Sequence, residues 1–96
     1  MITSKQRAKL RGIANSLKTT VYIGKNGLTE EVIDSLKDAI IARELVKCEI
    51  LENSSTNPKD AAIDSAQALN CEIVQIIGRK FILYRKNLKK RDGIKL

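Results

Sequence analysis

The stretch "TTVYIGKNGLTEEVIDSL", residues 19–36, holds a strand pattern, a glycine-bracketed loop and a helix pattern in immediate succession. Its first five residues are all β-branched or aromatic, which favours a β-strand. After the Gly-Lys-Asn-Gly segment at 24–27, Thr29 stands where it can cap a helix, and Glu30 and Glu31 stand where the helix dipole favours acids. The stretch therefore predicts a strand that passes through a tight loop directly into a helix.

The segment before this stretch has a helical period. In "TSKQRAKLRGIANSL", residues 3–17, apolar side chains recur at the i, i+3, i+4, i+7 spacing of one helix face. These residues are Leu10, Ile13, Ala14 and Leu17. Thr3 or Ser4 can cap the start of the helix. The remaining surface carries four basic residues, namely Lys5, Arg7, Lys9 and Arg11.

The segments after the quoted stretch continue the alternation of helix and strand. Residues 28–45 predict an amphipathic helix, and residues 45–51 alternate as a strand does when one of its faces is wet. The expected buried side of the helix consists of Val32, Ile33, Leu36, Ala39, Ile40 and the stem of Arg43. In the strand we expect Val46, Cys48 and Ile50 to be buried and Lys47 and Glu49 to be more exposed.

The last third of the chain predicts a helix and a hairpin. Asn57 and Pro58 are suited to the cap and the first position of a helix, and Asn70 can end it in the left-handed conformation. We expect Ala62, Ile63, Ala66 and Leu69 to face inward. The segments "CEIVQII" at 71–77 and "KFILYR" at 80–85 predict two strands that turn at Gly78 and Arg79.

The resulting fold is a single α/β domain over residues 1–96 with the order α-β-α-β-α-β-β. Strands that are joined through helices predict right-handed crossovers and parallel neighbours, whereas the final hairpin is antiparallel. We therefore expect a mixed four-stranded sheet with three helices that cover one face better than the other. The basic tail at residues 87–96 has little apolar pattern, so we expect it to be frayed, or to become ordered on a partner.

The charge of the chain is strongly uneven. The net charge is +7 over 96 residues, with +5 in residues 1–19 and, from eight basic residues against Asp92, +7 in residues 78–96. If the fold brings the two ends together, one face becomes cationic and suits a polyanion, of which nucleic acid is the first choice and an anionic membrane the second. A peripheral membrane role lacks a helix that is both strongly apolar and basic.

Several function classes are disfavoured by what the sequence lacks. It has no histidine, the commonest general base and a common metal ligand, so we expect neither catalysis nor a metal nor another cofactor. An enzyme that uses carboxylates such as Glu49 and Glu72 stays the least favoured alternative. Cys48 and Cys71 have no CxxC spacing and are expected to be reduced core residues. The start has no apolar signal segment and no run approaches a membrane span, so we expect a cytoplasmic protein.

The loop at 24–27 has two interpretations. In the first, Gly24 and Gly27 only relieve the strain of a tight turn. In the second, they bring bare backbone N–H groups at a helix start against a phosphate, with Lys25 adding a cation and Asn26 adding donors. A P-loop and a dinucleotide fingerprint are both absent. A GxxG loop is used in this way by KH domains to hold nucleic-acid backbone.

Two segments resemble a known family. "ITSKQRAKLRGIANSLKTTVYIGKNGLT" at 2–29 and "GRKFILYR" at 78–85 are similar to the two marks of the CRM domain, the chloroplast RNA splicing and ribosome maturation family. Thr19 departs from the pattern, which often has proline there. Such a domain of this length resembles the bacterial YhbY-type proteins, whose fold is similar to the C-terminal domain of translation initiation factor 3. The resemblance implies RNA binding at the GxxG loop and an association with precursors of the large ribosomal subunit.

The sequence and the resemblance together predict a monomeric protein that binds ribosomal RNA during assembly of the large (50S) subunit, with no small-molecule substrate. Tyr84 is the predicted base-stacking residue. The predicted RNA-binding residues are Gly24, Lys25, Asn26, Gly27, Lys5, Arg7, Lys9, Arg11, Arg79, Lys80, Tyr84 and Arg85. Leu83, Tyr84 and Arg85 can also be read as core and edge-strand residues. The main alternative function is a DNA-binding or nucleoid-like basic module, although the sequence offers no clear recognition helix or dimer seam.

Overall fold

A computed structural model describes residues 2–89, 93, 94 and 96 of the chain, and the element order predicted from the sequence is confirmed. The elements are α1 (Ser4–Ala14), β1 (Val21–Ile23), α2 (Glu30–Arg43), β2 (Leu45–Ile50), α3 (Pro58–Leu69), β3 (Glu72–Ile77) and β4 (Lys80–Tyr84). Within the described residues, no helix is long and apolar enough to span a bilayer.

The four strands form one mixed sheet in the order β1-β2-β4-β3. β1 and β2 are parallel, β4 is antiparallel to β2, and β3 is antiparallel to β4. The prediction that strands joined by helices are neighbours is therefore right for β1 and β2 and wrong for β2 and β3. β4 lies between them because its residues Phe81 to Tyr84 are all buried, which is the pattern of a central strand.

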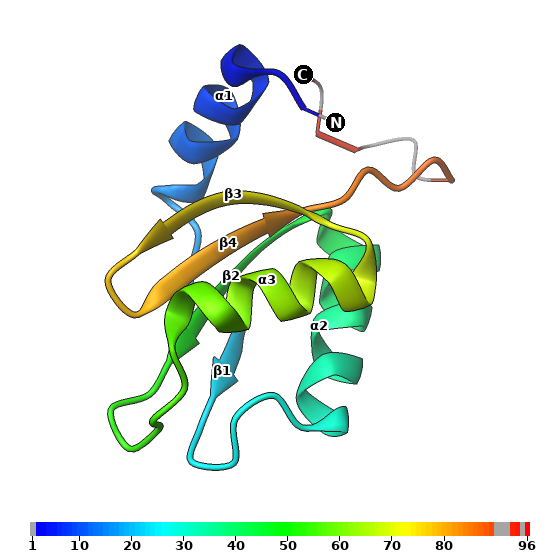
Figure 1. Cartoon of the computed structure of the whole chain (residues 1–96). Coiled ribbons are helices and arrows are strands. Elements are labelled where there is room, and N and C mark those ends of the chain that lie inside the picture. The colour runs from blue at the N-terminus through cyan, green and yellow to red at the C-terminus, as the bar shows by residue number, and fades with distance from the viewer. Residues whose placement is uncertain (1, 90–92, 95) are drawn as a thin grey trace.

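The helices cover the two faces of the sheet unequally, as Figure 1 shows. α2 and α3 pack on one face, over a core that includes Leu36, Ile40, Cys48 and Phe81. α1 packs alone on the other face and forms a second, smaller core. The members of this smaller core are Leu10, Ala14, Leu45, Val74, Ile82 and Tyr84, with Ile2, Ile13, Leu17 and Ile94 partly buried against them.

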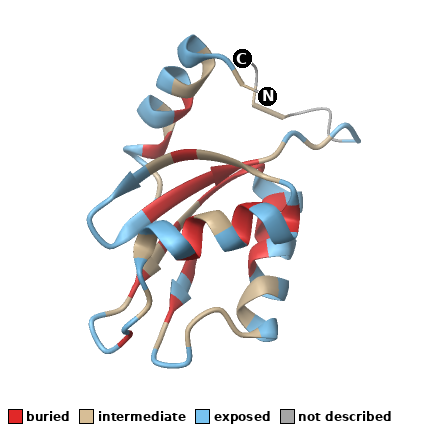
Figure 2. Ribbon diagram, in the orientation of Figure 1, coloured by how far each residue is buried: buried red, intermediate tan, exposed pale blue. Residues whose placement is uncertain are grey.

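Burial confirms most of the predicted inward positions, and Figure 2 shows how the buried residues line the sheet. Val46, Cys48 and Ile50 are buried, and Lys47 and Glu49 are only partly covered. Three expectations need correction. The second face of β2 is not solvent-exposed along its whole length, because α1 covers Leu45. Arg43, whose stem was expected to be buried on α2, is exposed. On α3, Ile63 is only partly buried, and Ala61 is buried.

Local side-chain hydrogen bonds define the helix starts, as predicted. Thr3 and Gln6 form a capping box at α1, and the Thr29 Oγ1 accepts a hydrogen bond from the Val32 N–H at α2. The Asn57 side chain accepts hydrogen bonds from two N–H groups at the start of α3, and Asn70 ends that helix at φ 55°. These caps fix where the chain leaves each helix, and so they position the loops between helices and strands.

The C-terminal segment is attached to the domain through Glu44. This carboxylate is 1% exposed and accepts hydrogen bonds from the N–H of Asn87 (2.7 Å, to Oε2) and of Ile94 (2.8 Å, to Oε1). The side chain of Ile94 packs against the core beneath α1. The expectation that residues 87–96 have little to bury is therefore wrong for Asn87 and Ile94. Lys90, Arg91 and Lys95 lie outside the described residues.

The two cysteines lie in environments that make them unequal in reactivity. Both are free thiols. Burial, with a smaller effect of the neighbouring Cys71, raises the pKa of the Cys48 thiol to about 12. Burial also raises the pKa of Cys71, although Arg85 opposes the shift and Cys71 is only half buried. A thiolate is the reactive form, so both geometry and ionisation protect Cys48 more.

We expect a thiol reagent at pH 8 to modify Cys71 and to leave Cys48 unmodified in the native protein. Cys48→Ala should lower the free energy of unfolding by about 1–2 kcal/mol, because it leaves a small cavity in a packed core. Mass spectrometry after timed labelling would check the order of modification. Rapid labelling of Cys48 without unfolding would contradict the register of β2.

Candidate nucleic-acid interface

The two glycines of the loop between β1 and α2 have different structural needs. Gly27 has φ 70°, and a Cβ there would lie 3.1 Å from Oγ1 of Thr56. Gly24 has no such φ, and a Cβ there would lie 3.9 Å from Cδ1 of Leu51, an ordinary contact. The conformation of the turn therefore requires glycine at position 27. It does not require glycine at position 24.

The start of α2 is capped by Thr29 and carries two acids. Thr29 already accepts the Val32 N–H (3.2 Å), and Glu30 and Glu31 lie in the first turn. These acids line the same shallow pocket as the loop and balance the positive end of the helix dipole. The interpretation that places a phosphate on the unpaired N–H groups of this helix start therefore stays a prediction, for which the Val32 N–H is already taken.

The tip of the loop is the part that stays available to an anion. Gly27 N–H donates to Gly24 O (3.0 Å), which closes the turn and leaves Lys25 and Asn26 exposed at its apex. Within the part of the chain that the structure describes, no protein acceptor takes the backbone N–H of Lys25 or Asn26. The apex thus offers two N–H groups, an amide side chain and a cation with no side chain at Gly24 to obstruct approach.

The loop between β2 and α3 lies against the loop between β1 and α2. The loop between β2 and α3 places Thr56 against Gly27, and the two loops lie side by side at one end of the molecule in Figure 1. Arg79 in the hairpin holds this second loop. Its Nε donates to Ile50 O (2.9 Å) and its Nη2 donates to Ser54 O (3.1 Å) and to Leu51 O. Arg79 is therefore first a positioning residue for the loops.

The predicted residues on β4 and directly after it are also engaged within the protein. Lys80 Nζ lies 3.7 Å from Glu49 Oε1, and Arg85 Nη1 donates to Leu69 O (2.8 Å). Tyr84 is only 4% exposed and belongs to the core beneath α1. Burial and the Glu44 carboxylate raise the pKa of its hydroxyl. A buried ring cannot stack on a base, so the stacking role predicted for Tyr84 is wrong.

The basic residues of α1 form a second group, away from the loop. Lys5, Lys9 and Arg11 are exposed, whereas Arg7 is half covered and its buried Nε has no hydrogen-bond partner among the described residues. In Figure 1, α1 and the loop after β1 lie at opposite ends of the molecule. The structure therefore does not bring the predicted residues into one cluster. They form an α1 group, which is Lys5, Arg7, Lys9 and Arg11, and a loop group, which is residues 24–27.

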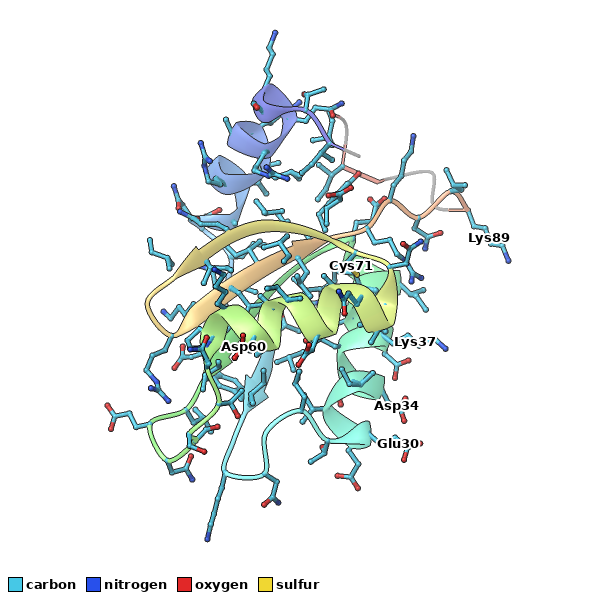
Figure 3. All side chains as sticks on the ribbon, in the orientation of Figure 1. Glu30, Asp34, Lys37, Asp60, Cys71 and Lys89 are labelled. Atoms are coloured by element: carbon cyan, nitrogen blue, oxygen red, sulfur yellow. The ribbon has the colours of Figure 1, made fainter. Side chains whose placement is uncertain are left out.

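The C-terminal segment, residues 87–96, reaches the core beneath α1 at Ile94. Ile94 and Ile2 share the core beneath α1, so the first and last parts of the chain come together. Lys86 and Lys89 are exposed, and the Asn87 side chain between them donates to Ile41 O of α2 (2.8 Å), so Lys89 lies on the α2 side of the molecule in Figure 3. The condition that the fold brings the two ends of the chain together is thus met at Ile2 and Ile94, whereas Arg79 and Lys80 lie at the hairpin.

Sequence reasoning missed one exposed aromatic residue. Tyr22 lies on the edge strand β1 and is 52% exposed, although its neighbours Val21 and Ile23 are buried. The alternation in "VYI" was the available signal, since a single strand with two buried ends must turn its middle residue to the other face. Within the described residues, no group of three or more His, Cys, Asp or Glu side chains is placed to hold a metal ion.

Comparison with known families decides the relationship. A sequence model of the CRS1 / YhbY (CRM) domain matches residues 2–85. The chain belongs to this family. The match of this CRM domain includes the Gly24–Gly27 loop, α1 and the whole of the sheet, so the geometry above is that of a family member and not of a chance GxxG segment.

The CRM domain is similar over nearly its full length to named bacterial proteins. It is 31% identical over 92 residues to "Probable RNA-binding protein YqeI" of Bacillus subtilis, covering 96% of each chain. It is 33% identical over 94 residues to "Probable RNA-binding protein PA4753" of Pseudomonas aeruginosa, covering 97% of this chain and 89% of that protein. The solution structure of the hypothetical protein SAV1595 from Staphylococcus aureus has a TM-score of 0.83 and 34% identity, with 100% and 99% coverage.

Proposed function

We propose that this protein binds ribosomal RNA, in the cytoplasm and without catalysis, and that it acts as an assembly factor of the large ribosomal subunit. The observation that carries the proposal is the meeting of the two basic ends of the chain. The described basic residues include Lys5, Arg7, Lys9 and Arg11 on α1 and Lys86 and Lys89 after β4, and Ile2, Leu10 and Ile94 join these two parts of the chain in one core.

The shape of the cationic surface favours a folded RNA. The α1 group and the loop group lie at opposite ends of a molecule whose longest extent is 36 Å. A ligand that contacts both groups must be long or folded, and it must present phosphates at both ends. Family membership and the names of the relatives support RNA, and the association with precursors of the large subunit follows the family resemblance.

The proposed mode of action is binding and release. Phosphate contacts from α1, the loop apex and the C-terminal segment would supply most of the affinity. The sequence has no motif for nucleotide hydrolysis, so any timing of release would come from changes in the RNA or from competing proteins. The protein is proposed to act as a monomer.

Crosslinking in cells, followed by sequencing of the bound RNA, tests this function directly. We expect reads to concentrate in a few regions of the large-subunit ribosomal RNA and its precursor. Reads spread evenly over messenger RNA would contradict the ribosomal role. Recovery of DNA in place of RNA would favour a nucleoid-like basic module.

A purified-protein experiment separates RNA from DNA binding. We expect higher affinity for a structured ribosomal RNA fragment than for DNA of the same length at equal salt. The logarithm of the affinity should fall with the logarithm of salt by roughly 0.7 to 0.9 per phosphate contacted. Equal affinities for RNA and DNA, or an affinity that is independent of salt, would contradict phosphate-led RNA binding.

A further inference from the structure

One row of side chains crosses all four strands on the face that α1 covers only in part. The strand registers pair Tyr22 with Glu49, Glu49 with Lys80, and Lys80 with Ile77. The row therefore runs Tyr22, Glu49, Lys80, Ile77 from one edge of the sheet to the other. At a strand spacing of about 4.8 Å it is roughly 14 Å long.

The row lies on the α1 side of the sheet but outside the area that α1 covers. Lys80 is two residues from Ile82 on β4, and Ile82 is buried beneath α1. Side chains two apart on a strand share a face, so Lys80 points to that same face. Tyr22 and Ile77 are nevertheless 52% and 57% exposed. α1 thus leaves this end of the sheet open.

The row has an unusual chemistry for an exposed surface of a basic protein. Its charged members neutralise each other, since Lys80 and Glu49 form an ion pair at 3.7 Å. Thr19 Oγ1 also donates to Glu49 Oε1 (3.4 Å). Its outer members are a tyrosine and an isoleucine. A surface that is locally neutral and apolar is poor for phosphate and good for a flat, uncharged ring.

The position of the row relative to the cations fits a nucleotide. Lys25, at the exposed apex of the loop, follows Tyr22 by three residues along the chain. At the other edge, Arg79 in the turn after Ile77 lines a shallow pocket between β2 and the hairpin, while Lys80 within the row is paired with Glu49. A phosphate next to a base stacked on Tyr22 would therefore have the exposed Lys25 ammonium as its cation.

We propose that this row binds an unpaired base of the RNA ligand, stacked on the ring of Tyr22. The inference rests on the proposed RNA-binding function and names the part of the RNA that the sheet recognises: a single-stranded loop or bulge rather than a continuous duplex. Tyr22 is the one candidate for such stacking, because the other two aromatic residues of the chain, Phe81 and Tyr84, are buried. Stacking on an aromatic side chain tolerates any base, so the row would add affinity with little sequence preference.

The test compares Tyr22→Phe with Tyr22→Leu. The first keeps the ring and the second keeps only an apolar side chain of moderate size. We expect Tyr22→Phe to bind a single-stranded ribosomal RNA oligonucleotide as the wild type does, and Tyr22→Leu to bind it about tenfold more weakly. Both variants should bind a fully paired duplex as the wild type does. Ile41→Leu, an exposed apolar residue on α2 outside the row, is the matched control and should change neither affinity.

Fluorescence gives a readout that a merely structural role would not move. In a Tyr84→Phe background, Tyr22 is the one tyrosine of the chain. Its emission should be quenched on addition of the single strand and should not change on addition of the duplex. Absence of quenching despite RNA binding, or an unchanged affinity of Tyr22→Leu, would overturn the stacking proposal and leave the RNA function standing.

Two further outcomes are separable from these. Absence of RNA binding by the wild type would remove the proposed function itself. If sedimentation shows that the wild type is a dimer and Tyr22→Leu is a monomer, the row binds a second copy of the chain, and the stacking proposal is wrong.

Discussion

Glu44→Ala is expected to lower the free energy of unfolding by about 3 kcal/mol, the largest effect on stability of any change discussed for this protein. The Glu44 carboxylate is buried and accepts hydrogen bonds from the N–H groups of Asn87 and Ile94. Hydrogen bonds to a charged group contribute roughly 1.5–3 kcal/mol each. Alanine removes both bonds and leaves a void beside the segment.

The loss should extend beyond the two bonds, because Glu44 joins several elements. Its backbone N–H donates to Ile40 O at the end of α2, and its backbone O accepts from Arg85 N–H at the end of β4. A Cβ built on Gly93 would lie 2.5 Å from Glu44 Oε1, so the segment closely approaches the carboxylate. Without the carboxylate, Ile94 loses the contact that holds it against the core beneath α1.

Thermal and denaturant unfolding would measure this effect. For a domain of this size a loss of about 3 kcal/mol corresponds to a fall in Tm of roughly 12–24 °C. Glu44→Gln is the matched control, since it keeps the volume and one acceptor oxygen, and it should cost about half as much. A Glu44→Ala protein within 0.5 kcal/mol of the wild type would show that the two hydrogen bonds do not hold the segment.

Truncation after Lys86 separates the role of the segment from that of the residue. Removing residues 87–96 leaves the Glu44 carboxylate without the N–H groups of Asn87 and Ile94, so truncation should also destabilise the domain. Glu44→Ala in the truncated chain should then cost much less than in the full chain. If Glu44→Ala lowers the free energy of unfolding equally in both chains, Glu44 stabilises the end of α2 and its contact with residues 87–96 contributes nothing.

The local structure of this protein was readable from its sequence because the signals are short-range. Thr3, Thr29, Asn57 and Asn70 begin or end helices through contacts within a few residues, and each was predicted from its neighbours alone. The order of the strands was less readable, because the place of β4 depends on burial on both of its faces. The run "FILY" carried that signal, since a strand with no polar alternation belongs in the middle of a sheet.

Only the part of the candidate site that lies on a loop could be predicted from the sequence. The apex residues Lys25 and Asn26 are exposed, as a turn between glycines predicts. Tyr84, the predicted stacking residue, is buried, and Tyr22, to which the sequence assigned no role, is exposed, because exposure on this sheet face depends on where α1 lies. The place of α1 is set by Leu10 and Ala14 packing with Val74 and Ile82, residues that are 60 or more positions away in the chain. No local pattern encodes such a contact.

Reversing the charge of the loop apex is the change expected to affect RNA binding most. Lys25→Asp combined with Asn26→Asp shifts the local charge by three units and keeps both glycines. We expect RNA affinity to fall at least tenfold, about 1.4 kcal/mol or more. Lys25 is the one cation among the residues that line the pocket beside the apex, and Glu30 and Glu31 line the same pocket. Replacing Lys25 by aspartate would therefore leave the pocket with negative charges only, which repel a phosphate.

Stability should hardly change in this variant. Both side chains are exposed, and the hydrogen bond that closes the turn joins Gly27 N–H to Gly24 O and uses neither of them. Aspartate tolerates turn conformations nearly as well as asparagine. Lys37→Glu with Gln67→Glu is a matched control, because it changes the net charge equally at exposed positions on α2 and α3. It should weaken binding only by the general effect of net charge.

Gly24→Ala distinguishes a bare backbone from a mere turn. The Cβ would make an ordinary contact 3.9 Å from Leu51 Cδ1, so the fold should be kept and can gain a few tenths of a kcal/mol from a stiffer unfolded chain. If a phosphate lies against the backbone of the apex, the added methyl group should weaken binding as well. Gly27→Ala, by contrast, should destabilise the domain, because it forces alanine to φ 70° against Thr56.

The decisive result is the comparison of Gly24→Ala with the aspartate pair, measured by RNA titration and thermal unfolding on the same samples. Reduced affinity in both, with normal melting, would place a phosphate at the apex within reach of the Lys25 ammonium. Reduced affinity in the aspartate pair alone would mean that Lys25 acts at longer range, through the field of the cationic surface. Unchanged affinity in both would reduce the loop to a turn and leave RNA binding to α1 and the C-terminal segment, whose attachment depends on Glu44.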